Sequence, residues 1–424
     1  MIGFFMFIMW ALISGFSLFL NRDIFSPTKF YLLNIGAYFG LIFIKSYEDV
    51  IYVYYLIFLA LGLIFIIVEP KVKLLHKMKS YINVNIDLDR KSMKKSILAI
   101  WIISAIPIIA QLYLIQYTGG IFNYVNNIGL RVVAWRGMGA VLELIKMFAV
   151  INLFYFAVLL IQKNTKIRDW IPYLIHFSVF LLIGFLSGSR GGLLWNIVFM
   201  LVAYHYLKKR VTLRKALTYA LILLVFASLL GTARNGYKLT SEGFRTGLST
   251  YEQSFDLKQF EYGIIPIQLL YQVDNSELEY GMTYLTPITN IIPRKIWPGK
   301  PDTGGIIFTQ RYTGNAWGGY SHLATGIIAE GVINFGMLFG PIVGIVVFLI
   351  VMWFVFKYYR KTIGFDITSM KHIVVILSYI YIVTSLPGLV KAEWTNAILD
   401  VTFKVIKLWI VYYSVYFIPK KILR

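Results

Sequence analysis

The amino-acid sequence predicts an all-α protein that crosses a lipid bilayer many times. Hydrophobic residues make up 58% of the 424 positions and charged residues only 14%, whereas a soluble domain is roughly half apolar and a quarter charged. The apolar residues are grouped into stretches close to the ~20 residues that cross the hydrocarbon core of a bilayer. These observations exclude a soluble fold, and we expect residues 1–424 to form a single integral membrane domain.

Eleven apolar stretches are predicted to span the membrane. In chain order they are 2–20, 30–44, 49–68, 97–117, 141–161, 170–186, 191–206, 216–231, 326–356, 371–388 and 397–418. The first stretch lacks a basic leader and a small-residue cleavage site, so it is read as a retained helix. One tight turn, Ser187 to Gly192, joins the sixth and seventh stretches. The ninth is too long for a simple span, so it must tilt, project from the membrane or break.

Lys and Arg residues predict the orientation of these spans. The link 69–96 carries eight of them, and shorter basic clusters recur at 163–168, 208–215, 357–361 and 420–424. With eleven spans, all five segments fall on one side, which the positive-inside rule makes cytoplasmic. Anionic headgroups therefore account for the formal charge of +21, and nucleic acid is not an expected partner.

The link 232–325, between the eighth and ninth spans, is then extracytoplasmic. It holds five of the twelve prolines, and Tyr251 to Gln272 has enough apolar residues for one or two helices lying at the membrane interface. Loops of this length are usually functional lids or binding surfaces. The links 118–140, 187–192 and 389–396 are expected on the same face.

Arginine is enriched on this outer face, where the positive-inside rule predicts depletion. A guanidinium presents a planar fork of donors that never deprotonates, so it suits phosphate or pyrophosphate. The alternative is that each arginine reaches lipid phosphates or pairs with an acidic residue of its own loop. Arg190 is the most distinctive, because it sits in the Gly-rich turn SGSRGG between two apolar spans. The seven residues are Arg131, Arg136, Arg190, Arg234, Arg245, Arg294 and Arg311.

His322 and Glu330 open the ninth span in the segment SHLATGIIAEGVINFG. Of the five histidines, only His322 is predicted outside, and a neutral imidazole can take a proton from a hydroxyl group near pH 7. The alternative is that His322 caps the helix or bonds to a neighbour. Glu330 would lie ~12 Å deeper if the helix is continuous, and a carboxyl at that depth is expected to face the bundle interior.

Metal and nucleotide chemistry find no support in the sequence. Cysteine is absent, so neither a disulfide framework nor a thiolate metal site is expected. The D-x-D segment Asp87 to Asp89 falls in the basic cytoplasmic link, away from the arginines. No P-loop is present, which argues against ATP-driven transport.

Three segments make the chain resemble the bacterial oligosaccharide repeat-unit polymerases, the Wzy-type or O-antigen polymerases. They are the turn SGSRGG, the segment YLTPITNIIPRKIWPGKP late in the long link, and SHLATGIIAEGVINFG. The resemblance covers about residues 180–345, and the remaining spans match only in hydropathy. The related O-antigen ligases share this arrangement. The first outer loop departs from the pattern, because it offers only RVVAWRG where a repeated Arg motif is expected.

The resemblance implies a metal-independent glycosyltransferase of the membrane-embedded C type (GT-C), in the bacterial cytoplasmic (inner) membrane, with its active site facing the periplasm or cell exterior. It would transfer a growing glycan en bloc from undecaprenyl pyrophosphate to a lipid-linked repeat unit, forming O-antigen, capsule or exopolysaccharide. No cofactor is expected, and the expected partners are undecaprenyl-pyrophosphate-linked glycans, membrane lipids, a chain-length regulator and a flippase. The implied catalytic residues are His322, Glu330 and Arg190, and the implied pyrophosphate ligands are Arg190, Arg294, Arg311, Arg234, Arg136 and Arg131.

Two alternatives stay open at this point. A ligase would move the finished glycan onto a lipid-A core or a protein. A transporter or flippase of lipid-linked sugars should place charges through both leaflets, often with internally repeated segments. Here the polar residues gather in the outer half and no repeat is visible, which favours the polymerase.

Overall fold

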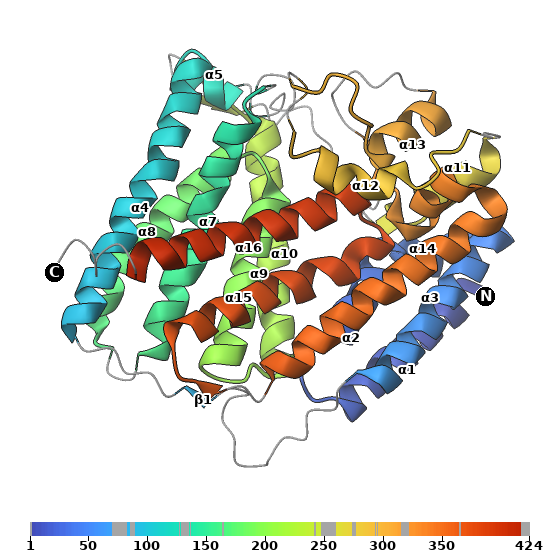
Figure 1. The fold of residues 1–424 in the computed structure, drawn as a ribbon, viewed down its shortest axis with the longest axis horizontal. Helices are drawn as coiled ribbons and strands as arrows, with labels where there is room; N and C mark the ends of the chain where they lie inside the picture. The colour runs from blue at the N-terminus through green and yellow to red at the C-terminus, as the bar shows by residue number, and fades with distance from the viewer. Residues whose placement is uncertain are drawn as a thin grey trace. The chain divides into compact units, whose positions relative to one another are not determined.

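The computed structural model is almost entirely helical (Figure 1). The few strands are short: β1 (Asn83–Val84) pairs with β4 (Asp366–Ile367), and β2 (Tyr237–Thr240) pairs with β3 (Gly243–Thr246). The structure describes residues 2–69, 83–84, 90–126, 128, 135, 137–162, 165–240, 243–246, 260–273, 277–292, 294, 296–314, 322–363 and 366–416.

Each of the eleven predicted stretches is mainly helical where the structure describes it. The bounds agree to the residue for α1 (Ile2–Leu20) and α3 (Asp49–Val68). The second stretch is a shorter helix, α2 (Pro27–Tyr38), followed by the 3-10 turn η1 (Gly40–Phe43). The others are α4 (Arg90–Tyr117), α7 (Gly139–Ile161), α8 (Ile167–Leu186), α9 (Arg190–Leu207), α10 (Leu213–Gly236), α14 (Gly326–Thr362), α15 (Met370–Ser385) and α16 (Trp394–Tyr416).

Within the described residues, seven helices are long and apolar enough to cross a membrane. They are α1, α3, α4, α7, α8, α14, and α15 together with the 3-10 turn η5 (Leu386–Val390). The apolar part of α9 is shorter than a full span, and α16 carries Asp400, Lys404 and Lys407. The protein is therefore a multi-pass membrane protein, and the count of eleven spans stays a prediction.

The chain divides into two compact units. Unit 1 comprises residues 1–75, 254–363 and 381–403, and unit 2 comprises 76–253, 364–380 and 404–424. In unit 1 the interior is rich in aromatic residues. Tyr31 of α2 is fully buried, packs against Phe65 and Phe348 with ring centroids 4.9 and 5.7 Å apart, and donates its hydroxyl to the Phe58 carbonyl. The predicted interfacial region includes α11 (Ile265–Gln272), which buries Ile267 and Leu270 in this unit.

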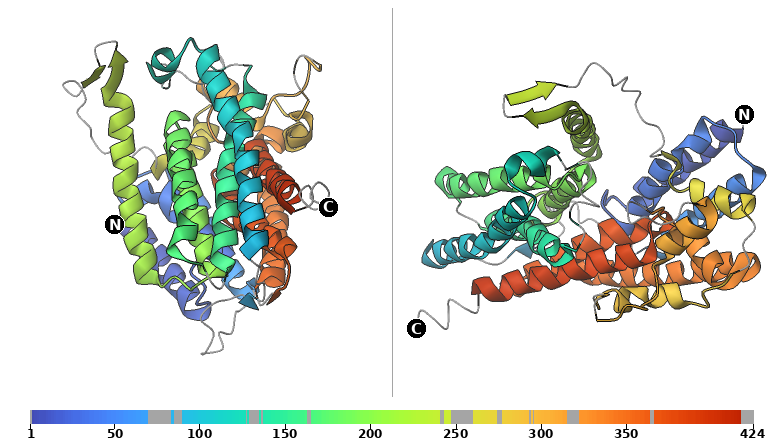
Figure 2. Two further views of the ribbon diagram at one scale, coloured as in Figure 1. Left: turned by 90° about the vertical axis from the view of Figure 1, so that its left-hand side faces the viewer. Right: turned by 90° about the horizontal axis from the view of Figure 1, so that it is seen from above.

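Unit 2 is built on α4, α7, α8 and α9. Its buried interior includes several polar side chains, among them His176 of α8, whose ring stacks on Phe148 at a centroid distance of 4.4 Å. The His176 ring nitrogens lie 2.9 Å from Ser104 Oγ and 3.1 Å from Asn152 Oδ1, so the buried imidazole is satisfied by neighbouring helices. Figure 2 shows the antiparallel β2–β3 pair beyond the C-terminal end of α10.

The ninth predicted span, α14, breaks at Gly336, where φ is 76° and ψ is 175°. Only glycine adopts this region without strain. The two halves fold back on each other as a helical hairpin. Their backbones are in close contact: a Cβ on Gly331 would overlap the carbonyl oxygen of Gly340, and one on Gly344 would overlap that of Ile327. In a straight helix, Ile327 and Gly344 would lie about 25 Å apart. Of the three outcomes allowed for this long stretch, the structure shows the break.

Candidate functional site

His322 and Glu330 lie on either side of the start of one short helix, α13 (Gly304–Thr313), in unit 1. A Cβ on Gly305 would lie 2.5 Å from His322 Cδ2, and one on Gly304 would overlap the Glu330 carboxylate. The depth estimate for Glu330 assumed a helix continuous from His322, whereas α14 begins only at Gly326. The hairpin places Glu330 in the short first half of α14. We call the group Gly304, Gly305, His322, Glu330, Glu393 and Asn396 the carboxylate–histidine cluster.

Glu393 holds the imidazole of His322. Nε2 of His322 lies 2.9 Å from Oε2 of Glu393, whose side chain is 2% exposed while that of His322 is 27% exposed. Asn396 Nδ2 also donates to this oxygen and lies 3.1 Å from His322 Nε2. A carboxylate only accepts hydrogen bonds, so the contact with Glu393 favours a proton on Nε2 of His322.

The second oxygen of Glu393 anchors the pair to α13. Oε1 accepts a hydrogen bond of 3.2 Å from the backbone N–H of Gly305, in the first turn of that helix. A carboxylate next to a helix N-terminus is favoured by the helix dipole. The absence of a side chain on Gly305 is what lets His322 and Glu393 both approach the helix backbone.

Glu330, the other carboxylate of the cluster, is hydrogen-bonded to hydroxyl groups. Its carboxylate is 1% exposed and accepts hydrogen bonds from Thr283 Oγ1 at 2.5 Å and Thr325 Oγ1 at 2.7 Å. Asn334, one turn further along, donates to Thr283 Oγ1 at 2.6 Å and accepts from the backbone N–H of Gly281 at 2.9 Å. Thr283 belongs to α12 (Met282–Thr289), so this network joins α12 to the first half of α14.

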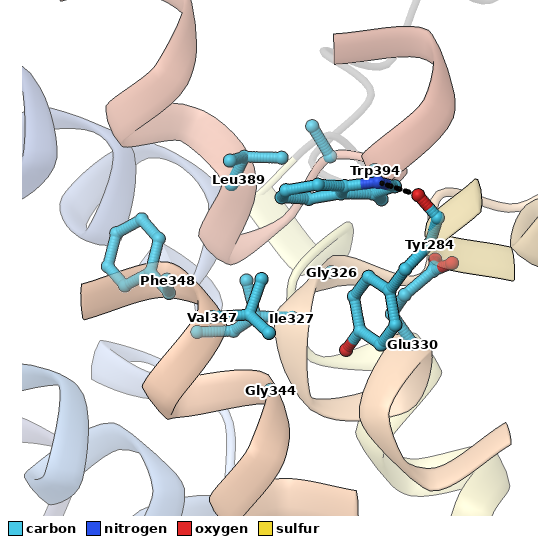
Figure 3. Close-up of a pocket in the computed structure, with 10 residues that line it drawn as sticks. Tyr284, Gly326, Ile327, Glu330, Gly344, Val347, Phe348, Leu389 and Trp394 are labelled. Carbon is cyan, nitrogen blue, oxygen red and sulfur yellow. Dashed lines mark hydrogen bonds between the residues drawn. The ribbon is translucent and has the colours of Figure 1, made fainter. Parts of the chain in front are cut away.

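A small pocket opens beside Glu330, between the halves of α14 (Figure 3). Tyr284 and Glu330 lie on one side of it and Val347 and Phe348 on the other. The Trp394 indole donates to the Tyr284 carbonyl at 3.0 Å. Burial raises the pKa of the Tyr284 hydroxyl, and the nearby Glu330 raises it further, so this phenol stays protonated.

Arg294 and Arg311 both pair with acidic residues of their own loop, as the alternative interpretation expected. Arg311 Nε lies 3.0 Å from Glu277 Oε2, and its NH2 group also pairs with Glu279. Arg294 pairs with Asp302 and remains exposed. Pyrophosphate binding by these two arginines stays a prediction.

Arg190 is the first residue of α9 in unit 2, directly after the turn. Gly188 has a φ of 63°, and the Ser189 hydroxyl caps the helix by accepting from Gly192 N at 3.1 Å. Arg234 lies in α10 and Arg245 in β3, and the side chains of these three arginines are outside the described part of the chain. Arg131 and Arg136 lie outside the described residues altogether.

Sequence reasoning missed Glu393 and Asn396. The available signal was an acidic residue in the short link 389–396, in the sequence KAEW. Its partners His322 and Gly305 are 71 and 88 residues away in the sequence, and only the fold shows that they are close in space. Among the described residues, no three His, Asp or Glu side chains are grouped as a metal site would require. No protein-family model, curated protein or solved structure matches this chain.

Proposed function

We propose that the chain is a polysaccharide polymerase, a glycosyltransferase that joins lipid-pyrophosphate-linked repeat units without a metal. The proposal includes eleven spans, a C-type architecture, the bacterial cytoplasmic membrane and a site on its outer face. The observation that carries it is the hydrogen bond of 2.9 Å between His322 and the buried Glu393. The sequence resemblance supplies the substrate class.

A histidine oriented by a buried carboxylate is the usual form of a general base. Glu393 fixes the ring position and stabilises the imidazolium that forms when His322 takes a proton. The side chain of His322 is 27% exposed and that of Glu393 is 2% exposed, so the imidazole reaches the surface while its carboxylate partner is buried.

The proposed step balances without a cofactor. A hydroxyl oxygen of the acceptor glycan attacks the anomeric carbon of the donor, and its proton passes to the imidazole of His322. The bond between that carbon and the pyrophosphate oxygen breaks, and undecaprenyl pyrophosphate leaves with the bonding pair. His322 later gives its proton to water.

Fixed positive charge is needed where the leaving group develops negative charge. Arg190 is the best candidate, because it lies at the N-terminus of α9, where backbone N–H groups and the helix dipole also favour an anion. Gly191 and Gly192 follow it, and a Cβ on Gly191 would meet nothing within 4 Å, so the backbone there is open to a ligand. Arg294 and Arg311 would exchange their carboxylate partners for phosphate.

Reconstituted protein with a lipid-linked repeat unit tests the proposal. His322→Ala is expected to lower the polymerisation rate by ~10²–10⁴-fold. Glu393→Gln should lower it less and change its pH profile, and Glu393→Asp should restore part of it. Gln310→Ala, at an exposed position of α13, is the matched control. Wild-type polymer from His322→Ala at equal membrane abundance would overturn the assignment.

The surface glycan of a deletion strain separates polymerase from ligase. Single repeat units on the surface imply that a polymerase is lost. Polymer that accumulates on undecaprenyl pyrophosphate implies instead that a ligase is lost, and would refute the proposal.

A further inference from the structure

Helix α12 has two faces of opposite character. Thr283, Thr286 and Pro287 are buried, and the two threonines bond to Glu330 and Thr395. The opposite face is apolar and exposed, with exposed fractions of 42% at Met282, 51% at Leu285 and 70% at Ile288.

Apolar exposure continues on both sides of α12. Tyr280, just before the helix, is 78% exposed, and the segment after it leaves Ile291, Ile296 and Trp297 at 60%, 75% and 41%. Exposed apolar side chains gathered along one segment in this way indicate an interaction site. We call the exposed side chains of Tyr280, Met282, Leu285, Ile288, Ile291, Ile296 and Trp297 the α12 apolar face.

The α12 apolar face adjoins a helix that is itself a candidate membrane span. The backbone N–H groups of Glu279 and Tyr280 donate to the carbonyls of Ile333 and Asn334, at 3.0 and 3.1 Å, just before the bend of α14. Directly after the bend, Leu338 is 75% exposed. Phe339 and Ile342 follow at 62% and 60%. In a span, such side chains contact lipid, so the α12 apolar face extends a lipid-facing surface within unit 1.

We propose that α12 is an interfacial membrane helix, whose apolar face rests in the acyl chains of the leaflet at which α14 bends. An amphipathic helix of this kind lies in the membrane plane with its apolar side sunk ~5–10 Å below the headgroups. Tyr280, two residues before α12, and Trp297, eight residues after it, are of the types that prefer the membrane–water boundary. The sequence had indicated Tyr251 to Gln272 for this role; residues 251–259 lie outside the described part of the chain, and α11 from that region buries Pro266, Ile267 and Leu270.

The position of α12 has a consequence for the site, which rests on the proposed function. Because Thr283 on the inner face of α12 bonds to Glu330, the carboxylate–histidine cluster lies directly behind the interfacial helix. A substrate could present its sugar to His322 while its polyprenyl chain stays in the bilayer.

Single cysteines test the placement, because the chain has no native cysteine. In the variants Leu285→Cys and Ile288→Cys, the cysteine carries a nitroxide label and the protein is placed in proteoliposomes. Spin relaxation then measures how often the label collides with oxygen, which concentrates in the bilayer, and with a water-soluble nickel complex. Leu338→Cys serves as the lipid reference and Gln310→Cys as the polar reference; both positions are exposed. All four sites are on the surface, so unfolding temperatures close to that of the wild type are expected in detergent.

The expected result is that labels at 285 and 288 collide with oxygen in preference to nickel, as at 338, at a depth of ~5–10 Å. Preference for nickel, as expected at 310, would overturn the proposal, because the face would then be in water. Protection from both reagents would also overturn it, since another protein surface would cover the face. The experiment needs no catalytic activity, so it can fail or succeed independently of the proposed polymerase.

Discussion

At Gly305, the addition of a single methyl group is expected to reduce activity with little loss of stability. A Cβ there would lie 2.5 Å from His322 Cδ2, 2.8 Å from the Leu323 carbonyl oxygen and 3.0 Å from Glu393 Cδ. Carbon atoms pack at about 3.5–4.0 Å, so these neighbours must move by roughly 1 Å. Such a movement is enough to break the 2.9 Å hydrogen bond between His322 and Glu393.

Gly305→Ala should therefore affect activity more than stability. Overpacking costs about 1–3 kcal/mol, and alanine gains about 0.5–1 kcal/mol over glycine within a helix, so the net loss of unfolding free energy is about 0–2.5 kcal/mol. Misplacing a catalytic group by about 1 Å can lower the rate by on the order of 10²-fold. The assay pairs thermal unfolding in detergent with polymer formation in proteoliposomes.

Gly299→Ala is the matched control in the same loop, because a Cβ there would meet nothing within 4 Å. It should keep full activity and gain about 0.4–1 kcal/mol through the lower entropy of the unfolded chain. Full activity and unchanged stability in Gly305→Ala would refute the geometry of the carboxylate–histidine cluster. Equal loss of activity in both variants would show that the loop itself is sensitive to substitution, so that the close contact at Gly305 does not explain the loss.

Three further predictions follow from other parts of the molecule. Arg190→Lys keeps the charge but loses the bidentate fork, so polymer yield at equal membrane abundance should stay low; a normal yield would remove Arg190 from the site. Glu69, 4% exposed, accepts from Thr28 N and Asn21 Nδ2, both at 2.9 Å, so Glu69→Ala should lose about 1–3 kcal/mol for each donor left unsatisfied. Burial raises the pKa of Glu69, so the neutral Glu69→Gln should be tolerated better, and the reverse order of unfolding temperatures would contradict this account. A phosphatase fused near Ser276 should be active and one fused after Arg424 inactive; the opposite pattern would invert the topology.

The helices could be predicted because the bilayer restricts which backbone structures are stable within it. Without water in the hydrocarbon core, every backbone N–H and C=O must be satisfied within the segment, so an apolar stretch of sufficient length becomes a helix. The agreement at 2–20 and 49–68 reflects this constraint. The second stretch ends earlier than predicted because α2 gives way to a 3-10 turn at Gly40.

The bend in α14 was only partly predictable. The length of residues 326–356 required a tilt, a projection or a break, and hydropathy could not choose among them because the sequence is largely apolar on both sides of Gly336. The choice depends on Gly336, which takes a left-handed φ, and on close backbone contact at Gly331 and Gly340. Glycine spacing carries that information, since small residues let helices approach closely.

The candidate site was predictable as a set of residue types but not as a network. His322 and Glu330 could be singled out because a charged or titratable residue beside an apolar span needs a reason. Their spatial relation could not be predicted, because His322 and Glu330 are brought together by contacts with α13 and Glu393, which are distant from them in sequence. The arginines illustrate the converse: Arg311 is prominent in the sequence, yet in the fold its guanidinium pairs with Glu277 and Glu279.

The hairpin also explains why two carboxylates can be buried so close to one helix. Glu330 and Glu393 are 1% and 2% exposed, and an unpaired carboxylate at such a depth costs several kcal/mol. Each is instead supplied with its own donors: hydroxyl groups for Glu330, and His322 with the Gly305 amide for Glu393. Because the α14 hairpin and the two glycines of α13 bring those donors together, the bend at Gly336 and the cluster behind α12 are parts of one arrangement.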